Sequence, residues 1–127
     1  MKEAFLLLTL LAFPISSLAQ ENETCEGAMT TYDISMCFSR ILKKVERELN
    51  STYQRALTLT QRDYTARDVQ NLRFAERRWM AYRVAACNAE YELWGFGSGG
   101  PAAHTGCLIK IAKQRIADLK EAYLMSR

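Results

Sequence analysis

The chain has 127 residues, a net charge of +3 and a hydrophobic fraction of 49%. This length suits one compact domain and excludes a large multidomain enzyme. Nucleic-acid-binding proteins concentrate basic charge on one surface and interleave it with exposed aromatic residues. The sequence shows no such pattern, so we expect no nucleic-acid partner.

The first 19 residues, MKEAFLLLTLLAFPISSLA, have the pattern of a cleavable signal peptide. Lys2 precedes an apolar run from Ala4 to Phe13, and small residues end the segment. The apolar run is too short to span a bilayer. We expect a single mature domain over residues 20–127, periplasmic or secreted, without an integral membrane segment; a buried N-terminal helix is the alternative.

Four cysteines, Cys25, Cys37, Cys87 and Cys107, form an even set. In an exported chain such a set predicts two disulfides, each stabilising by about 3 kcal/mol. Proximity in the sequence favours Cys25 with Cys37 and Cys87 with Cys107, while a Cys37–Cys87 bond remains the rival. The chain has no CxxC pair and one histidine, which argues against a zinc site. We expect no metal and no cofactor.

Apolar residues recur at alternating steps of three and four, which is the periodicity of a helix. The first such stripe runs from Ile34 to Leu59, and Thr30 with Asp33 forms a capping-box pattern before it. The second stripe consists of Leu72, Ala75, Trp79, Tyr82, Ala86, Ala89 and Leu93. Aromatic residues at this spacing usually belong to the core, so Trp79 and Tyr82 are expected to be buried.

The segment GFGSGGPAAHTG, residues 95–106, contains five of the six glycines and Pro101, and it is expected to be a loop. A third helix is expected from about Thr105. Its apolar side consists of Leu108, Ala112, Ile116, Leu119 and Tyr123. These segments predict an all-α fold, an antiparallel three-helix bundle with a glycine-rich loop before the last helix.

Arg115 interrupts the apolar pattern of the third helix. A guanidinium there must be paired or stacked on an aromatic ring. Glu76 and Trp79 are the candidate neighbours, and a structural role is favoured over a binding role.

The sequence lacks a convincing catalytic group. His104 is expected in the glycine loop, the cysteines are expected to be oxidised, and Glu90 and Glu92 point to different sides of one helix. Catalysis needs a nucleophile beside a base, separated carboxylate pKa values or a metal. We therefore predict that the protein is not an enzyme.

Charge is unevenly distributed along the chain. Residues 20–37 contain Glu21, Glu23, Glu26 and Asp33 and no basic residue. Basic residues form rows on the first and third helices: Arg40, Lys44 and Arg47, and Lys110, Lys113 and Lys120. Such rows are usually solvated, and a weak attraction to anionic envelope polymers is the alternative.

Several of these segments together form the pattern of a known family. They are TTYDISMC ending at Cys37, VERELNSTY, LRFAERRWMAYRVAAC, the loop Gly97–Gly100 and CLIKIAKQRIADL, and they contain Leu49, Asn50, Tyr53, Trp79, Tyr82, Arg83 and Arg115. In this order and spacing the chain resembles the lysozyme inhibitor LprI N-terminal domain family of small exported bacterial proteins. The family commonly has glutamine, an acidic residue and threonine where this chain has Glu76, Val84 and Ala112.

The resemblance implies an all-helical, disulfide-linked envelope or secreted domain that binds a protein partner, lysozyme or another envelope protein. The common animal lysozymes are basic, so an acidic surface would favour association. The candidate binding residues are Glu21, Glu23 and Glu26 before the first helix, and Phe96, Ser98 and His104 in the glycine loop. The alternatives are an envelope-binding module for anionic glycan or lipid, and an accessory or immunity partner of a secreted effector.

Overall fold

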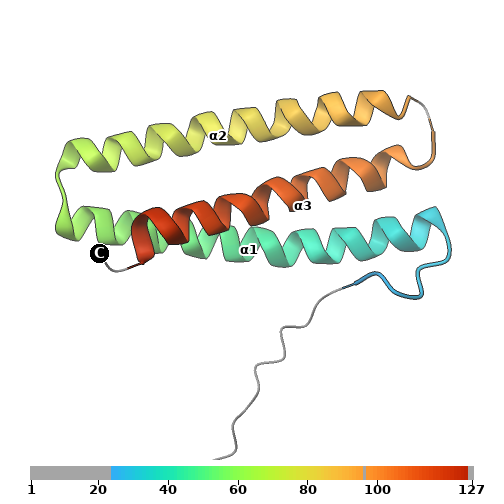
Figure 1. Ribbon diagram of the computed structural model, residues 1–127, viewed down its shortest axis with the longest axis horizontal. Helices are drawn as coiled ribbons and strands as arrows, with labels where there is room; N and C mark the ends of the chain where they lie inside the picture. The colour runs from blue at the N-terminus through green and yellow to red at the C-terminus, as the bar shows by residue number, and fades with distance from the viewer. Residues whose placement is uncertain (1–23, 96, 126–127) are drawn as a thin grey trace, which may run out of the picture.

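The computed structural model describes residues 24–95 and 97–125, which form three long helices (Figure 1). The helices are α1 (Thr31–Asp63), α2 (Ala66–Leu93) and α3 (Gly100–Leu119), and α3 continues into a π-helical turn, η1 (Lys120–Leu124). No strand occurs in these ranges. Figure 1 shows α1 and α3 running in one direction and α2 in the other. The predicted all-α, antiparallel three-helix bundle is therefore confirmed.

Capping boxes start the first two helices. The Thr30 hydroxyl accepts a hydrogen bond from the Asp33 backbone N–H at 3.1 Å, and the Asp33 carboxylate accepts one from the Thr30 N–H. Thr65 and Asp68 repeat the arrangement at the start of α2. Each box satisfies backbone donors that a helix start leaves unpaired. The second box lets α2 begin three residues after α1 ends, within the segment where a break was expected.

The third helix begins earlier than predicted. Residues 100–104 are helical, so the expectation that they and His104 lie in a loop was wrong. Pro101 fits the first turn because backbone N–H groups there have no intrahelical acceptor. Gly100 is required for close packing, since a Cβ at this position would lie 2.9 Å from the Tyr91 ring.

The core lies mainly between α1 and α3, and α2 packs chiefly on α3. Its buried residues are Ile41, Val45, Leu49 and Ala56 of α1, Leu72 of α2, and Ile109, Ala112, Ile116 and Leu119 of α3. The buried residues that belong to the first and third predicted stripes recur with the helical periodicity, as expected. Tyr123, by contrast, is exposed on η1.

The predicted seam of α2 was wrong. Tyr82 is 61% exposed, Leu93 is also exposed, and Trp79 is only partly buried. Leu72 of the predicted seam is buried, and Trp79 packs against the core, but the other buried residues of this helix are Val69, Arg83 and Cys87. Inter-helix ion pairs and a disulfide start from this second face, and they fix how α2 is rotated against its neighbours.

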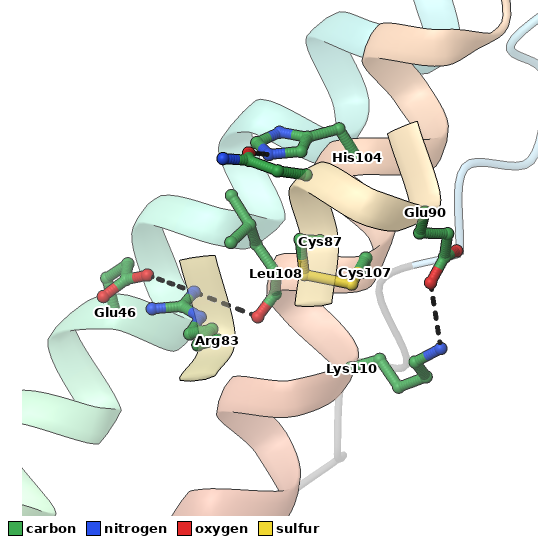
Figure 2. Close-up of a disulfide and its surroundings, with 9 residues drawn as sticks. Glu46, Arg83, Cys87, Glu90, His104, Cys107, Leu108 and Lys110 are labelled. Atoms are coloured by element: carbon green, nitrogen blue, oxygen red, sulfur yellow. Dashed lines mark hydrogen bonds and ion pairs between the residues drawn. A yellow bond between two sulfur atoms is a disulfide. The ribbon is translucent and has the colours of Figure 1, made fainter. Parts of the chain in front are cut away.

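Both disulfides have the pairing that sequence proximity favoured. Cys25 is bonded to Cys37 and Cys87 to Cys107, with Cα–Cα distances of 5.9 and 5.6 Å. The rival Cys37–Cys87 pairing is thereby excluded. The first bond ties the chain before α1 to its first turns, and the second joins α2 to α3 (Figure 2).

Candidate functional site

Both disulfides lie at the same end of the bundle. Figure 1 shows that α1 starts where α2 ends and α3 begins. We call the segments 24–37 and 84–107 together the disulfide end. They bring the two predicted binding regions, the acidic segment and the glycine loop, to one end of the molecule.

The connection between α2 and α3 is short and held in place. The Gly95 N–H donates to the Glu92 carbonyl at 3.1 Å and the Gly100 N–H to the Gly97 carbonyl at 3.1 Å. A Cβ at Gly99 would lie 3.0 Å from the Trp94 ring. The glycines therefore let aromatic rings of α2 lie directly against the chain, as well as allowing it to turn.

His104 helps to hold α3 against α2. Its Nε2 lies 3.2 Å from Asn88 Oδ1, and its ring meets Tyr91 edge-on at a centroid distance of 5.9 Å. One turn further along α3, the buried Cys107 joins Cys87 (Figure 2). The Cys87–Cys107 disulfide therefore fixes the two helices that the loop connects.

Large apolar side chains are exposed at the disulfide end. Those at the start of α1 are Met29, Tyr32 and Met36, and those at the end of α2 are Tyr91, Leu93 and Trp94. Trp94 is 55% exposed. Aromatic residues and methionine are enriched at protein interfaces, and a group of exposed apolar side chains marks an interaction surface.

The disulfide end is also acidic. It contains four carboxylates and no lysine or arginine: Glu26, Asp33, Glu90 and Glu92. The hydroxyl and backbone N–H of Thr30 hold the pKa of Asp33 below its ordinary value, so this carboxylate is charged at neutral pH. Glu90 lies 3.5 Å from Lys110, which enters this region from α3 (Figure 2). The basic residues that make the whole chain positive lie mostly elsewhere.

A polar network ties the three helices together beneath this end. Arg83 of α2 donates to the Glu46 carboxylate of α1 and to the Leu108 carbonyl of α3, the latter at 2.9 Å (Figure 2). Arg115 donates to Glu76 Oε2 through Nε and Nη2 at 3.0 and 2.7 Å.

Trp79 links the two arginines of this network. The Arg83 and Arg115 guanidinium carbons lie 5.5 and 5.7 Å from the centre of the Trp79 ring. Both neighbours expected for Arg115, the carboxylate of Glu76 and the Trp79 ring, are thus present. Among the family-motif residues, Leu49 is buried, Tyr53 is partly buried and Asn50 is exposed. These contacts hold the three helices of the bundle together.

The structure places the predicted binding residues unequally. Glu26 and Ser98 are exposed at the disulfide end, and His104 is half-buried within it. Glu21, Glu23 and Phe96 lie outside the described residues, as does the expected signal peptide. The sequence analysis did not select Tyr91 and Trp94 as candidate binding residues. A signal was present, because both are aromatic, lie beside the glycine loop and fall outside the predicted apolar stripe of this helix.

Within residues 24–95 and 97–125, no group of three His, Cys, Asp or Glu side chains is arranged to hold a metal ion. No helix of this part of the chain has the length and apolar character needed to cross a membrane.

The fold and its two disulfides define a small helical domain of the kind found in oxidising, extracytoplasmic compartments. Residues 22–119 match the family model described as Lysozyme inhibitor LprI, and the chain belongs to this family. It is 30% identical over 112 residues to a protein of Rhizobium meliloti (strain 1021) described as uncharacterized, with 80% of each chain covered. No solved structure gives a significant match.

Proposed function

We propose that this protein is an exported domain that binds and inhibits a lysozyme, acting by binding and not by catalysis. The observation that carries the proposal is the match of residues 22–119 to the lysozyme inhibitor LprI family. The two disulfides support export, because such bonds form and persist in oxidising compartments.

We place the contact with lysozyme at the disulfide end. A basic lysozyme would meet Glu26, Asp33, Glu90 and Glu92 there, and complementary charge raises the rate of association. The net charge of +3 does not oppose this contact, because the two segments of this end carry four carboxylates and no lysine or arginine, with Arg40 and Lys110 beside them. Charge separation along the molecule would also orient the inhibitor as it approaches.

The exposed aromatic residues of this end would supply most of the binding energy. Tyrosine and tryptophan dominate interface hot spots, where truncation to alanine costs about 2 kcal/mol or more. Trp94 is exposed beside a loop whose base is fixed by the Cys87–Cys107 bond. A fixed loop loses less conformational freedom on binding than a flexible one.

A cell-wall lysis assay tests the proposal. A basic animal-type lysozyme is mixed with excess purified protein, and the clearing of suspended bacterial cell walls is followed. We expect inhibition by the wild-type protein and roughly 30-fold weaker inhibition by Trp94→Ala, the equivalent of about 2 kcal/mol. The matched control is Tyr64→Ala, which removes an exposed aromatic side chain from the α1–α2 turn.

The two variants also separate the two parts of the proposal. Full lysozyme activity with excess wild-type protein would contradict inhibition itself. Equal inhibition by Trp94→Ala and Tyr64→Ala would leave inhibition standing and contradict the placement of the contact at the disulfide end.

A further inference from the structure

The outer side of α2 carries a group of arginines around an exposed phenylalanine. We call Arg73, Phe74, Arg77 and Arg78 the arginine face. With 3.6 residues per turn, Phe74 lies on the opposite side of the helix from the buried Leu72 and Arg83. The arginine face therefore points away from the bundle.

Among residues 24–95 and 97–125, the arginines of this face have no carboxylate partner. Between Asp68 and Glu90 the only acidic residue of α2 is Glu76, and its carboxylate is bound to Arg115 of α3. Within the described part of the chain, Arg73, Arg77 and Arg78 make no ion pair. Their positive charge is available to an external anion.

The phenylalanine is held among these charges. The guanidinium carbons of Arg77 and Arg78 lie 5.9 and 5.1 Å from the centre of the Phe74 ring, and Phe74 is 51% exposed. Two further apolar side chains, Tyr82 and Val84, are exposed between two and three turns beyond Phe74, one on each flank of this side of α2. The arginine face thus combines cations with exposed apolar side chains. A basic surface that only contacts water does not need such apolar side chains.

We propose that the arginine face binds the anionic phospholipid surface of the cell envelope. Arginine forms paired hydrogen bonds with phosphate oxygens, and aromatic and apolar side chains beside basic residues enter the headgroup region of a bilayer. A soluble polyanion would satisfy the arginines, but it would leave Phe74 and the flanking Tyr82 and Val84 in water. A lipid surface satisfies both kinds of side chain.

The first helix provides the comparison. Arg40, Lys43 and Arg47 form a basic row on the outer side of α1, next to Lys44, which the sequence analysis placed in this row. Exposed Tyr32 and Met36 precede this row on α1, but among the described residues the aromatic rings with a guanidinium over them are Phe74 and Trp79. We therefore assign lipid binding to α2 and not to the basic row of α1.

This inference goes beyond inhibition and uses a different surface. Binding through the side of α2 would lay the helix along the membrane and leave its C-terminal end, with the exposed Trp94, open to a protein partner. The protein would then be held at the surface that a cell-wall-degrading enzyme must approach.

Vesicle co-sedimentation tests the proposal. The purified protein is mixed with vesicles of phosphatidylcholine alone or of phosphatidylcholine with an equal part of phosphatidylglycerol. We expect binding only to the anionic vesicles and weaker binding at higher salt. Binding to neither vesicle, or equally to both, would overturn the proposal.

Two triple variants with the same charge change locate the site. Arg73→Gln/Arg77→Gln/Arg78→Gln should bind the anionic vesicles about 100-fold more weakly, since each arginine near the surface contributes about fivefold. Replacing Arg40, Lys43 and Arg47 with glutamine should weaken binding by less than about fivefold. Equal loss in both variants would show unspecific attraction by the whole charge and would contradict the assignment.

Phe74→Ala distinguishes a membrane from a polyanion. This variant should bind the vesicles roughly fivefold more weakly, because apolar surface no longer enters the headgroup region. Its retention on dextran sulfate should not change. Unchanged vesicle binding, or equal loss on both materials, would overturn the lipid assignment.

The variants also distinguish lipid binding from lysozyme inhibition. All substituted side chains are exposed, so circular dichroism should show the wild-type thermal transition. The arginine triple variant should still inhibit lysozyme in solution to the wild-type extent. Loss of vesicle binding with inhibition retained would separate the two surfaces.

Discussion

Removal of the Glu76–Arg115 pair gives the sharpest prediction about stability. Arg115 donates two hydrogen bonds to one carboxylate oxygen of Glu76, and the two side chains are only 16% and 13% exposed. We consider Glu76→Ala, Arg115→Ala and the double variant. The pair connects α2 to α3, so its loss acts on the contact that holds α2 in the bundle.

The magnitude follows from this burial. Breaking a buried ion pair by removing one partner costs about 3–5 kcal/mol, because the other charge is left without compensation. The slight exposure of both side chains, and the Trp79 ring that remains beside Arg115, favour the lower limit for Glu76→Ala. We expect each single variant to lose about 3 kcal/mol and the coupling energy of the pair to be about 2 kcal/mol.

Urea and thermal unfolding of the four proteins measure the coupling. A loss of about 3 kcal/mol lowers Tm by roughly 10–20 °C in a domain of this size. The control is the cycle for Glu48 and Lys120, which form a 2.7 Å ion pair at 53% and 47% exposure. Exposed pairs contribute about 0–1 kcal/mol. A coupling energy for Glu76–Arg115 no larger than that of the control pair would refute the reasoning.

Four further variants test other parts of the structure. Cys87→Ala/Cys107→Ala should lower the free energy of unfolding by about 3 kcal/mol in a urea titration, because a closed loop of this length constrains the unfolded chain; an unchanged midpoint would contradict this. Thr65→Ala should cost about 1 kcal/mol through loss of the α2 cap, and a thermal scan that matches the wild type would contradict it. Gly100→Ala should destabilise by about 1–3 kcal/mol because its Cβ would overlap a tyrosine ring, and a gain in Tm would show that the ring can move. Hydrogen bonds from Thr65 lower the pKa of Asp68 from its ordinary value of 3.8, so its contribution is present above that value and is lost as pH falls through the lowered pKa. Asp68→Asn should therefore flatten the acid limb of a plot of stability against pH, and an unaltered acid limb would contradict the assignment.

Local signals in the sequence were sufficient to predict much of the fold. The spacing of Thr30 and Asp33 marked the start of α1, since the capping box is made within one helical turn. The disulfide pairing followed from proximity in the chain. The neighbours of Arg115 followed from the need of a half-buried guanidinium for a carboxylate and an aromatic face.

The rotation of α2 and the start of α3 could not be predicted in the same way. Counting apolar residues placed Tyr82 inside, but the helix turns Glu76, Arg83 and Cys87 toward its neighbours. The two ion pairs join residues 37 and 39 positions apart, so the apolar pattern of α2 alone does not show which side of the helix faces inward. The helical role of Gly100 depended on the Tyr91 ring, which is another tertiary contact.

The candidate site was predicted in outline only. Glu26 and Ser98 were named as candidates and are exposed, but Tyr91 and Trp94 were not included. Their exposure results from the rotation of α2 and from the short loop after it.

Hydrogen exchange of this protein, with and without a basic lysozyme, tests most directly whether the disulfide end is the inhibitory surface. We predict that lysozyme slows amide exchange in residues 24–37 and 88–104 and leaves the turn around Tyr64 unchanged. Protection confined to the α1–α2 turn, or exchange that lysozyme does not alter anywhere, would contradict it.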